Sequence, residues 1–304
     1  MTQQRQGAIV AAGLCALLFL SPFGATLRAQ SPSSSENEEK GLTFYEQFQG
    51  SSNSLGQIMK LDTSVGWDFN RYFGVDAGVP FYFIRASTTA ASTGAQSGNG
   101  IGNVYADLRL TLLNPLVNYS STLTGTAPTG DKALGLSTGR ATFDWNNHFD
   151  HRFGSIRPFV SAGIANSVSD TLLYTRPFTT LGFVSHFEGG ARLRIVRGVH
   201  LGASLYDILP SGQQKVFSRL RGRGSIMPGA TLRHRGGVFE NAFETVGGAD
   251  IAKDNGFSAW LDASPMRYLN LEAGYTRSVP YDLNTVSFGV GLNLGSVIRL
   301  ARGR

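Results

Sequence analysis

Apolar and polar residues alternate one for one along roughly a dozen short segments of this chain, between residues 42 and 294. In one such segment Phe73 and Val75 lie on one face, while Gly74 and Asp76 lie on the other. A period of two predicts β-strands that have one apolar face and one polar face. The predicted strands are 42–49, 57–69, 72–84, 102–113, 116–127, 140–150, 156–168, 181–195, 199–208, 256–264, 267–277 and 285–294.

The connections between these strands alternate between short and long. Bacterial outer-membrane barrels have short periplasmic turns and longer external loops, whereas a soluble β-sandwich has no reason to sort its connections by length. The pattern therefore predicts an all-β protein, a transmembrane antiparallel up-and-down β-barrel of about 12 strands that starts and ends on the periplasmic side. A strand pair hidden in the longest loop would raise the number to about 14. The short connections are 70–71, 114–115, 151–154, 196–198 and 265–266, and the long ones are 85–101, 128–139, 169–180, 209–255 and 278–284.

The chain opens with the three-part layout of a secretory signal peptide. Arg5 precedes an apolar stretch at 8–20, and a small-residue region ends at Ala29. The apolar stretch is too short to span a bilayer. Cleavage after Ala29 is the preferred interpretation, with Thr26 as a competing site, and Cys15 leaves a lipoprotein signal as an alternative. The predicted organisation is a signal peptide at 1–29, a flexible lead at 30–41, an outer-membrane β-barrel at 42–294 and a C-terminal tail at 295–304.

The last predicted strand carries a sorting signal. Gly289, Leu292 and Leu294 match the spacing of glycine, hydrophobic, any residue, hydrophobic by which outer-membrane proteins are recognised for assembly. Phe288 departs from the signal, since a polar residue is usual there. Closing the barrel requires this strand to pair with the first one, because an open edge would leave amides unsatisfied in hydrocarbon. We therefore expect the bacterial outer membrane as the location and the barrel assembly machinery as a partner during biogenesis.

Composition limits the chemistry. The only cysteine lies in the predicted signal peptide, so the mature chain has no disulfide, thiolate metal site or cysteine nucleophile. An outer-membrane lipid hydrolase needs a His and a Ser together on the outward face, and none of the histidines is expected to meet that requirement. No His, Asp and Glu spacing suggests a metal, so we expect no enzyme activity and no cofactor. The histidines are His148, His151, His186, His200 and His234.

Three glycine-rich motifs resemble those of a known family. The run GIGNVYADLR stands at 100–109, APTGDK at 127–132 and a glycine-rich stretch at 135–139. This combination resembles the MetA-pathway phenol-degradation family of outer-membrane transporter-like β-barrels, in which a G-x-G-D-x strand opening precedes a P-T-G-D loop. Asn103 stands where the family more often has Asp. The resemblance implies a twelve-stranded barrel that passes small, aromatic or hydrophobic, compounds across the outer membrane.

The polar faces of the strands are expected to line the lumen. A barrel of about 12 strands leaves room for a narrow pore or an internal binding channel. Acids facing bases across the lumen would set up a transverse field that selects small polar solutes. Alternatively, the same groups pair into a salt-bridge plug that fills the barrel. The candidate lumen residues are Lys60, Asp62, Asp68, Asp76, Asp107, Arg109, Asp144, His148, His186, Glu188, Arg192, Arg194 and Glu272.

The connection at 209–255 is too long for a simple loop, and loops of that length are usually functional or partly folded. Its basic residues suggest contact with the phosphates and carboxylates of lipopolysaccharide. A second interpretation is an inward-folded constriction whose arginines oppose lumen carboxylates, and a third is a solvated basic loop. The residues concerned are Lys215, Arg219, Arg221, Arg223, Arg233 and Arg235.

The predicted function is therefore an outer-membrane channel or transporter for a small-molecule solute. The alternative is a plugged structural or adhesive barrel without transport, and an outer-membrane lipid hydrolase is the third candidate. Outer-membrane lipid and lipopolysaccharide are the expected surroundings. Export removes the chain from nucleic acid, and the basic loop lacks interleaved aromatic residues, so no nucleic-acid partner is expected.

Overall fold

The computed structural model describes residues 41–53, 56–87, 97–168, 170–171, 173–220, 244–266 and 268–294. Apart from Gly41, the predicted signal peptide and lead lie outside these residues, and so does the C-terminal tail. Within the described part no helix is long and apolar enough to cross a membrane. The elements are β1 (Gly41–Asn53), β2 (Gly56–Asp68), β3 (Phe73–Ala86), β4 (Gly98–Ile101), β5 (Tyr105–Leu112), β6 (Asn118–Thr126), η2 (Lys132–Leu134), β7 (Thr142–Asp150), β8 (Ile156–Ala165), β9 (Phe178–Leu181), β10 (Val184–Val196), β11 (Val199–Pro210), β12 (Gln214–Ser218), β13 (Glu244–Gly247), η4 (Ala249–Ala252), β14 (Asp254–Met266), β15 (Leu269–Ser278) and β16 (Leu283–Asn293).

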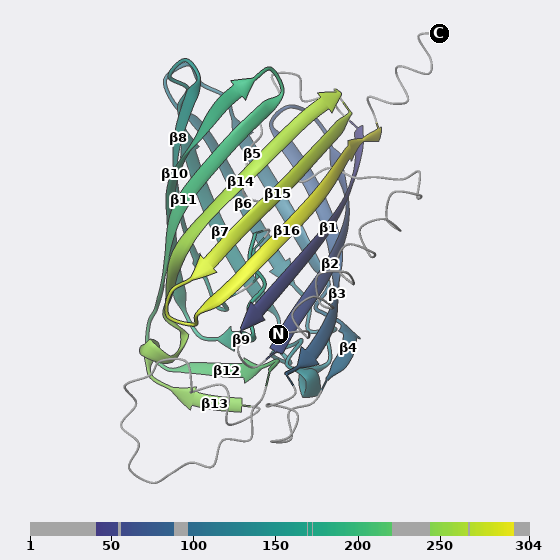
Figure 1. The fold of residues 1–304 in the computed structure, drawn as a ribbon, viewed down its shortest axis with the longest axis vertical. Helices are drawn as coiled ribbons and strands as arrows, with labels where there is room; N and C mark the ends of the chain where they lie inside the picture. Colours follow the sequence, from purple (N-terminus) through teal and green to yellow (C-terminus); the bar gives the residue numbers. More distant parts are fainter. Residues whose placement is uncertain are drawn as a thin grey trace, which may run out of the picture.

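Twelve of these strands form one closed antiparallel barrel (Figure 1). The ring closes because β1 pairs with both β2 and β16, so that Phe48 lies opposite Leu61 on one side and Phe288 on the other. The predicted all-β, transmembrane up-and-down barrel is confirmed. In order around the ring, the strands are β1, β2, β3, β5, β6, β7, β8, β10, β11, β14, β15 and β16.

The two ends of the barrel carry different connections. At the end we call the turn end, short turns join β2 to β3, β5 to β6, β7 to β8, β10 to β11 and β14 to β15. The loop end carries the long connections. The predicted sorting by length has two exceptions at the loop end, because only residues 54–55 separate β1 from β2 and only residues 279–282 separate β15 from β16. Gly50, Ser51 and Ser52 pair with both neighbouring strands, and their small side chains concealed this part of β1 in the apolar pattern.

A second, smaller sheet crosses the loop end (Figure 1). It consists of β9, β12 and β13, which lie in connections that were predicted as loops. The alternative of fourteen barrel strands is therefore wrong, because β12 and β13 pair with each other and with β9 and not with the barrel. These strands are also far shorter than the 9–11 residues or so that cross a bilayer. Phe178 and Val216 of this sheet pack with Tyr281 and Leu283 in a buried apolar cluster.

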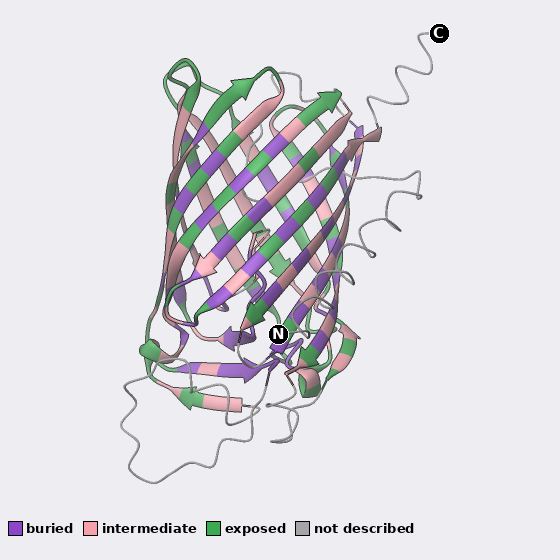
Figure 2. Ribbon diagram, in the orientation of Figure 1, coloured by how far each residue is buried: buried purple, intermediate pink, exposed green. Residues whose placement is uncertain are grey.

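Burial alternates along the barrel strands, as the striped ribbons in Figure 2 show. The outward face carries exposed apolar side chains such as Val65, Trp67 and Phe288. The inward face is polar and packed, and Gln49 and Thr285 are both 0% exposed. This arrangement is the reverse of a water-soluble protein and fits a barrel whose outside meets lipid.

Glu46 is an exception on the apolar outer face. It lies near the middle of β1 on the face of Phe44 and Phe48, and its Oε2 accepts a 2.7 Å hydrogen bond from the Thr63 hydroxyl. An acidic side chain that faces lipid destabilises a barrel. We therefore expect Glu46→Val to raise the free energy of unfolding by about 1 kcal/mol in urea titrations of the protein in phospholipid vesicles. Thr63→Val, which removes the hydrogen bond and keeps the carboxylate, should lower it. A less stable Glu46→Val variant would contradict this prediction.

Candidate functional site

The lumen wall is built from the polar face of the strands, and the predicted lumen residues all fall on that face. Most of them are buried, whereas Arg194 is exposed near the turn end of β10. By strand, they are Lys60, Asp62 and Asp68 on β2, Asp76 on β3, Asp107 and Arg109 on β5, Asp144 and His148 on β7, His186, Glu188, Arg192 and Arg194 on β10, and Glu272 on β15.

Charge pairs in this wall reach over glycines. Arg109 on β5 lies 2.8 Å from Asp68 on β2 and 3.2 Å from Asp76 on β3. β3 runs between β5 and β2 and presents Gly74 at this point. A Cβ at Gly74 would lie 2.6 Å from Asp68 Oδ1, so a larger residue would block the pair.

The same arrangement recurs around the barrel, where two polar side chains from strands two apart meet over the glycine of the strand between them. Over Gly78, Tyr105 Oη lies 3.1 Å from Asp62 Oδ1. Over Gly163, His186 Nε2 lies 2.9 Å from Asp144 Oδ1, and over Gly202, Arg192 Nη2 lies 2.6 Å from Asp262 Oδ2. Of these groups, Arg192 neutralises Asp262, whereas Tyr105 gives Asp62 a neutral hydroxyl donor and Asp144 meets an imidazole. The transverse field suggested by the sequence stays a prediction.

The connection between β8 and β10 folds into the barrel, and we call its described residues between 166 and 177 the inward segment. Gln49 Nε2 donates to Thr171 O at 2.8 Å, and the Thr175 hydroxyl donates to Gln49 Oε1 at 2.6 Å. The Ser51 hydroxyl donates to Thr175 O at 2.5 Å. Gln49 and Ser51 belong to β1, which lies six pairings from β8 in either direction around the ring. The inward segment therefore crosses the whole lumen.

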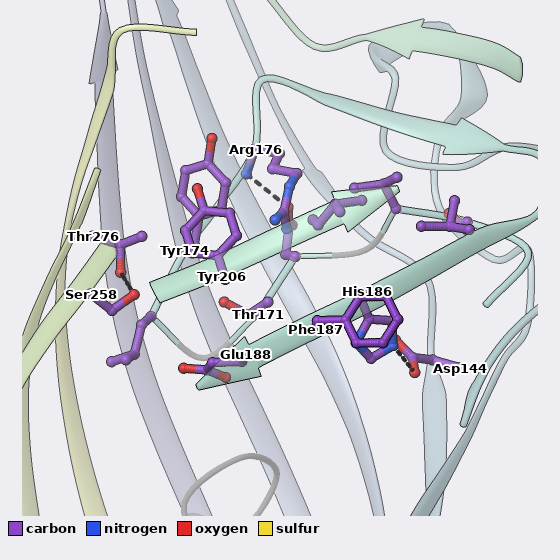
Figure 3. A pocket seen from close by; sticks show the side chains of 16 residues that line it. Asp144, Thr171, Tyr174, Arg176, His186, Phe187, Glu188, Tyr206, Ser258 and Thr276 are labelled. Atoms are coloured by element: carbon purple, nitrogen blue, oxygen red, sulfur yellow. Dashed lines mark hydrogen bonds and ion pairs between the residues drawn. The ribbon is translucent and has the colours of Figure 1, made fainter. Parts of the chain in front are cut away.

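A cavity of about 90 Å³ lies beside the inward segment (Figure 3). Leu173 of that segment reaches the β15 wall, where a Cβ at Gly274 would lie 2.6 Å from Leu173 Cδ2. Carboxylates, an imidazole and hydroxyl groups line the cavity, so it offers a polar solute several hydrogen-bonding partners. They include Asp144, His186, Glu188, Tyr206, Ser258 and Thr276.

Buried charge holds the inward segment in place. Arg176 Nη2 lies 3.5 Å from Asp254 Oδ2, and the two side chains are 1% and 0% exposed. The Arg176 guanidinium also stacks on Tyr174, 4.3 Å from the ring centroid. Tyr174 packs against Tyr206 of β11 with 6.1 Å between ring centroids. A charge buried to this degree stays favourable only while its partners remain in place.

Arg219 joins the inward segment to the rest of the loop end. Its Nη1 donates to both oxygens of Asp170, at 3.0 and 2.8 Å, and to Arg176 O at 2.9 Å. Its Nε donates to Gly135 O at 3.2 Å, and its guanidinium lies 4.6 Å from the Tyr82 ring centroid. One side chain therefore fastens the inward segment, the β6–β7 connection and the β3 wall together.

Asp170 is ionised in this setting. Burial raises the pKa of the Asp170 carboxyl, but the charges of Arg219 and Lys60 and the hydrogen bond from the Tyr82 hydroxyl outweigh that effect. The pKa of Asp170 therefore lies below its ordinary value. The Asp170–Arg219 pair stays charged at neutral pH.

The basic residues of the predicted loop 209–255 divide into two groups. Arg219 faces inward, as the constriction interpretation requires, whereas Lys215 forms an ion pair with Glu244, which also lies 3.7 Å from Lys132. The remaining candidates, Arg221, Arg223, Arg233 and Arg235, lie outside the described residues.

The sequence did not reveal the residues of the inward segment. Asp170, Tyr174 and Arg176 fell in a connection predicted as an external loop at 169–180. The only available signal was an acid, an aromatic residue and an arginine within a few positions of one another.

Asn166 ends β8 before the predicted 168, because its Oδ1 accepts the Phe143 N–H at 2.8 Å.

A serine, a histidine and an aspartate also meet in the wall. His148 Nδ1 lies 2.8 Å from Ser161 Oγ, and His148 Nε2 lies 3.7 Å from Asp150. Asp150 is held at 2.5 Å by Arg157, and Ser161 is only 3% exposed, so this set is arranged as wall packing and not as an accessible nucleophile. In the part of the chain that the structure describes, no group of three His, Cys, Asp or Glu residues is placed to hold a metal ion.

Comparison with known proteins supports the fold. Neither a family model nor a curated protein sequence matches the chain, so the resemblance to the phenol-degradation family stays a prediction. The chain is similar in structure to the COG4313 outer membrane channel from Pseudomonas putida F1, with a TM-score of 0.56, 13% identity and coverage of 86% of this chain and 100% of the channel. It also resembles the NanC porin, with a TM-score of 0.47, 7% identity and coverage of 82% and 99%. At 13% identity the likeness to the COG4313 channel shows the barrel fold alone.

Proposed function

We propose that the protein is a channel of the bacterial outer membrane that passes small compounds, including aromatic or hydrophobic ones. One observation carries the proposal: a single segment crosses the lumen, is anchored to the opposite wall and leaves a polar cavity beside it. A wall that only sealed the barrel would need no such cavity. In this arrangement the inward segment limits the size of the solute, and the charged wall and cavity supply its binding groups.

Aromatic side chains in the lumen support the choice of solute. Phe159 and Trp260 both face inward, with 6.1 Å between ring centroids, and the His148 imidazole stacks on Phe159 at 5.2 Å. Flat rings of this kind pack against aromatic or apolar parts of a solute. The turn end faces the periplasm in this proposal, and the loop end faces the outside of the cell.

Conductance measurements test the proposal. The purified protein should form discrete channels in planar bilayers and should let small solutes into liposomes in order of size. Gln49→Ala removes the two hydrogen bonds of Gln49 to the inward segment, so we expect its channel conductance to roughly double. Gln57→Ala, a change to an exposed side chain near the loop end of β2, is the matched control and should leave conductance unchanged.

A plugged structural or adhesive barrel is the second candidate. The pairing of wall charges and the burial of Gln47, Gln49 and Thr285 favour it, because a wall packed in this way can fill a narrow barrel. It predicts no permeation by any solute for the natural sequence. Permeation by the natural protein would exclude it.

Lipopolysaccharide is a proposed partner of the loop end. Lys215 and Lys132 share one acidic contact, Glu244, so this group keeps an excess of positive charge that attracts phosphate. Binding to lipopolysaccharide micelles should weaken as salt concentration rises. Lys215→Glu and Lys132→Glu should weaken it further.

A further inference from the structure

The basic side chains of the lumen wall are largely neutralised. Among the described residues of the spanning strands, each inward lysine and arginine except the exposed Arg194 forms an ion pair. The pairs are Lys60 with Asp62 at 3.4 Å, Arg109 with Asp68 at 2.8 Å, Arg157 with Asp150 at 2.5 Å and Arg192 with Asp262 at 2.6 Å. The wall therefore contributes little net positive charge away from the turn end.

Three inward carboxylates form no direct ion pair with a described lysine or arginine, and Arg109 and Arg192 act on Asp107 and Glu272 only at longer range. Asp107 on β5, Glu188 on β10 and Glu272 on β15 form no ion pair with any lysine or arginine that the structure describes, and each lies within its strand and not at an end. Asp107 accepts a 2.5 Å hydrogen bond from the Thr124 hydroxyl. The three groups come from well-separated parts of the ring, so they act on the lumen from several sides.

Buried polar atoms near Glu272 are available to bind a solute in the lumen. Trp260 Nε1, Tyr45 Oη and Ser287 Oγ have no hydrogen-bond partner among the described residues, and these residues are 3%, 3% and 1% exposed. They face inward from β14, β1 and β16, on both sides of the strand that carries Glu272. Buried polar groups are normally hydrogen-bonded, so these three atoms are available to water or to a solute in the lumen.

Two glycines lie beside Glu272 in the wall. Gly289 lies directly opposite Glu272 on β16, and Gly274, two residues along β15, lies opposite both Trp260 and Ser287. Leu173 of the inward segment covers Gly274, where a Cβ would lie 2.6 Å from Leu173 Cδ2, so Gly289 is the position beside the carboxylate at which the described wall carries no side chain. Glu188 has comparable access, because it lines the cavity beside the inward segment together with the hydroxyls of Ser258 and Thr276 (Figure 3).

We propose that this lumen selects cations, so that small inorganic cations and small amine-bearing solutes pass in preference to anions of similar size. Glu188 and Glu272 are the selecting groups, and Asp107 adds to their field. Uncompensated carboxylates around a narrow passage attract cations and repel anions, as acidic rings do in cation channels. Hydroxyls and carboxylates replace part of the water lost by the cation, while the Trp260 indole offers its ring face to an ammonium group. This inference rests on the proposed channel function.

Reversal potentials test the inference. The full mature chain is placed in planar bilayers with a KCl gradient, and ethanolamine hydrochloride then replaces KCl. We expect a several-fold preference for K⁺ and ethanolammonium over Cl⁻. Glu188→Gln and Glu272→Gln should each reduce it, and the variant that combines them with Asp107→Asn should bring it close to parity.

The matched control is Glu46→Gln, which removes the same charge from the outer face of the barrel. It should leave the reversal potential unchanged. Heat-modifiable migration checks that every variant has assembled. Anion preference, or an unchanged reversal potential in both single variants, overturns the inference while the channel function stands. A natural protein that conducts no ion at all overturns the proposed function itself, and the selectivity with it.

Discussion

Replacement of Gly202 by leucine is expected to prevent the barrel from assembling. Gly202 faces the lumen from β11, and the indole of Trp260 on the next strand lies across it. A Cβ at this position would lie 2.6 Å from Trp260 Nε1, and Arg192 reaches over the same residue to Asp262. Overpacking costs about 1–3 kcal/mol even where neighbours can move, and displacing Arg192 would add the cost of a broken buried pair, about 3–5 kcal/mol.

The loss is measured as the absence of heat-modifiable migration and of protease resistance after refolding into detergent. Gly189→Leu is the matched control, because Gly189 faces outward and a Cβ there meets nothing within 4 Å. It should assemble normally. Trp260→Gly combined with Gly202→Leu should recover part of the folded fraction, since the large side chain is then supplied by the other strand. Normal assembly of Gly202→Leu alone would show that the wall is far looser than its contacts indicate.

Removal of the Arg219 side chain is expected to release the inward segment. Arg219→Ala leaves the Asp170 carboxylate buried without its principal counter-charge and removes the hydrogen bonds that Arg219 donates to the carbonyls of Gly135 and Arg176. Breaking a buried ion pair by removing one partner costs about 3–5 kcal/mol. Single-channel recordings should show larger and noisier currents, and limited proteolysis should cut the β8–β10 connection.

The pH dependence of the natural protein gives an independent check. Because the pKa of Asp170 is lowered in the folded protein, its contribution to stability is complete above the ordinary pKa of an aspartate and is lost as the pH falls through the lowered value. The natural channel should therefore become noisy only in strong acid, while Arg219→Ala is noisy already at neutral pH.

Two further variants decide whether the buried charge pair is responsible. Arg219→Met combined with Asp170→Leu leaves no unpaired charge from this pair. The single-channel current of the double variant should therefore fluctuate less than that of Arg219→Ala. Arg140→Ala, a change to an exposed arginine of the β6–β7 connection, is the control and should have no effect. Quiet currents in Arg219→Ala would mean that Asp254 and the β1 contacts hold the inward segment without Arg219.

The barrel strands were predictable because lipid imposes a simple rule on them. Each strand must present apolar groups to the bilayer and keep polar groups inside, so the alternation of residues such as Phe73 and Gly74 records the fold directly. The pattern marked strand ends less well: small residues on both faces concealed the end of β1 at Gly50 and Ser51, and β8 ends at Ala165, before the predicted 168. The strands of the small sheet at the loop end are too short, and too far from lipid, to follow that rule.

The candidate site was predictable only in part, since alternation identifies the inward face but not the partners on it. Arg109 is paired because β3 carries a glycine at the right register, and the offset between β5 and β2 is set by the pairing of whole strands. Asp170 and Arg219 are 49 residues apart in the chain and meet only because two connections fold over the same opening.

The sequence by itself determined that this protein is a barrel of antiparallel strands, which face of each strand is apolar, and which end carries the long connections. These properties follow from local periodicity and from the cost of exposing polar backbone to lipid. The tertiary structure alone decided that the β8–β10 connection crosses the lumen, that Arg219 holds it in place, and that Asp107, Glu188 and Glu272 form no ion pair with a lysine or arginine in the described part of the chain. The physical reason is that each of these depends on contacts between distant segments, which exist only once the ring has closed.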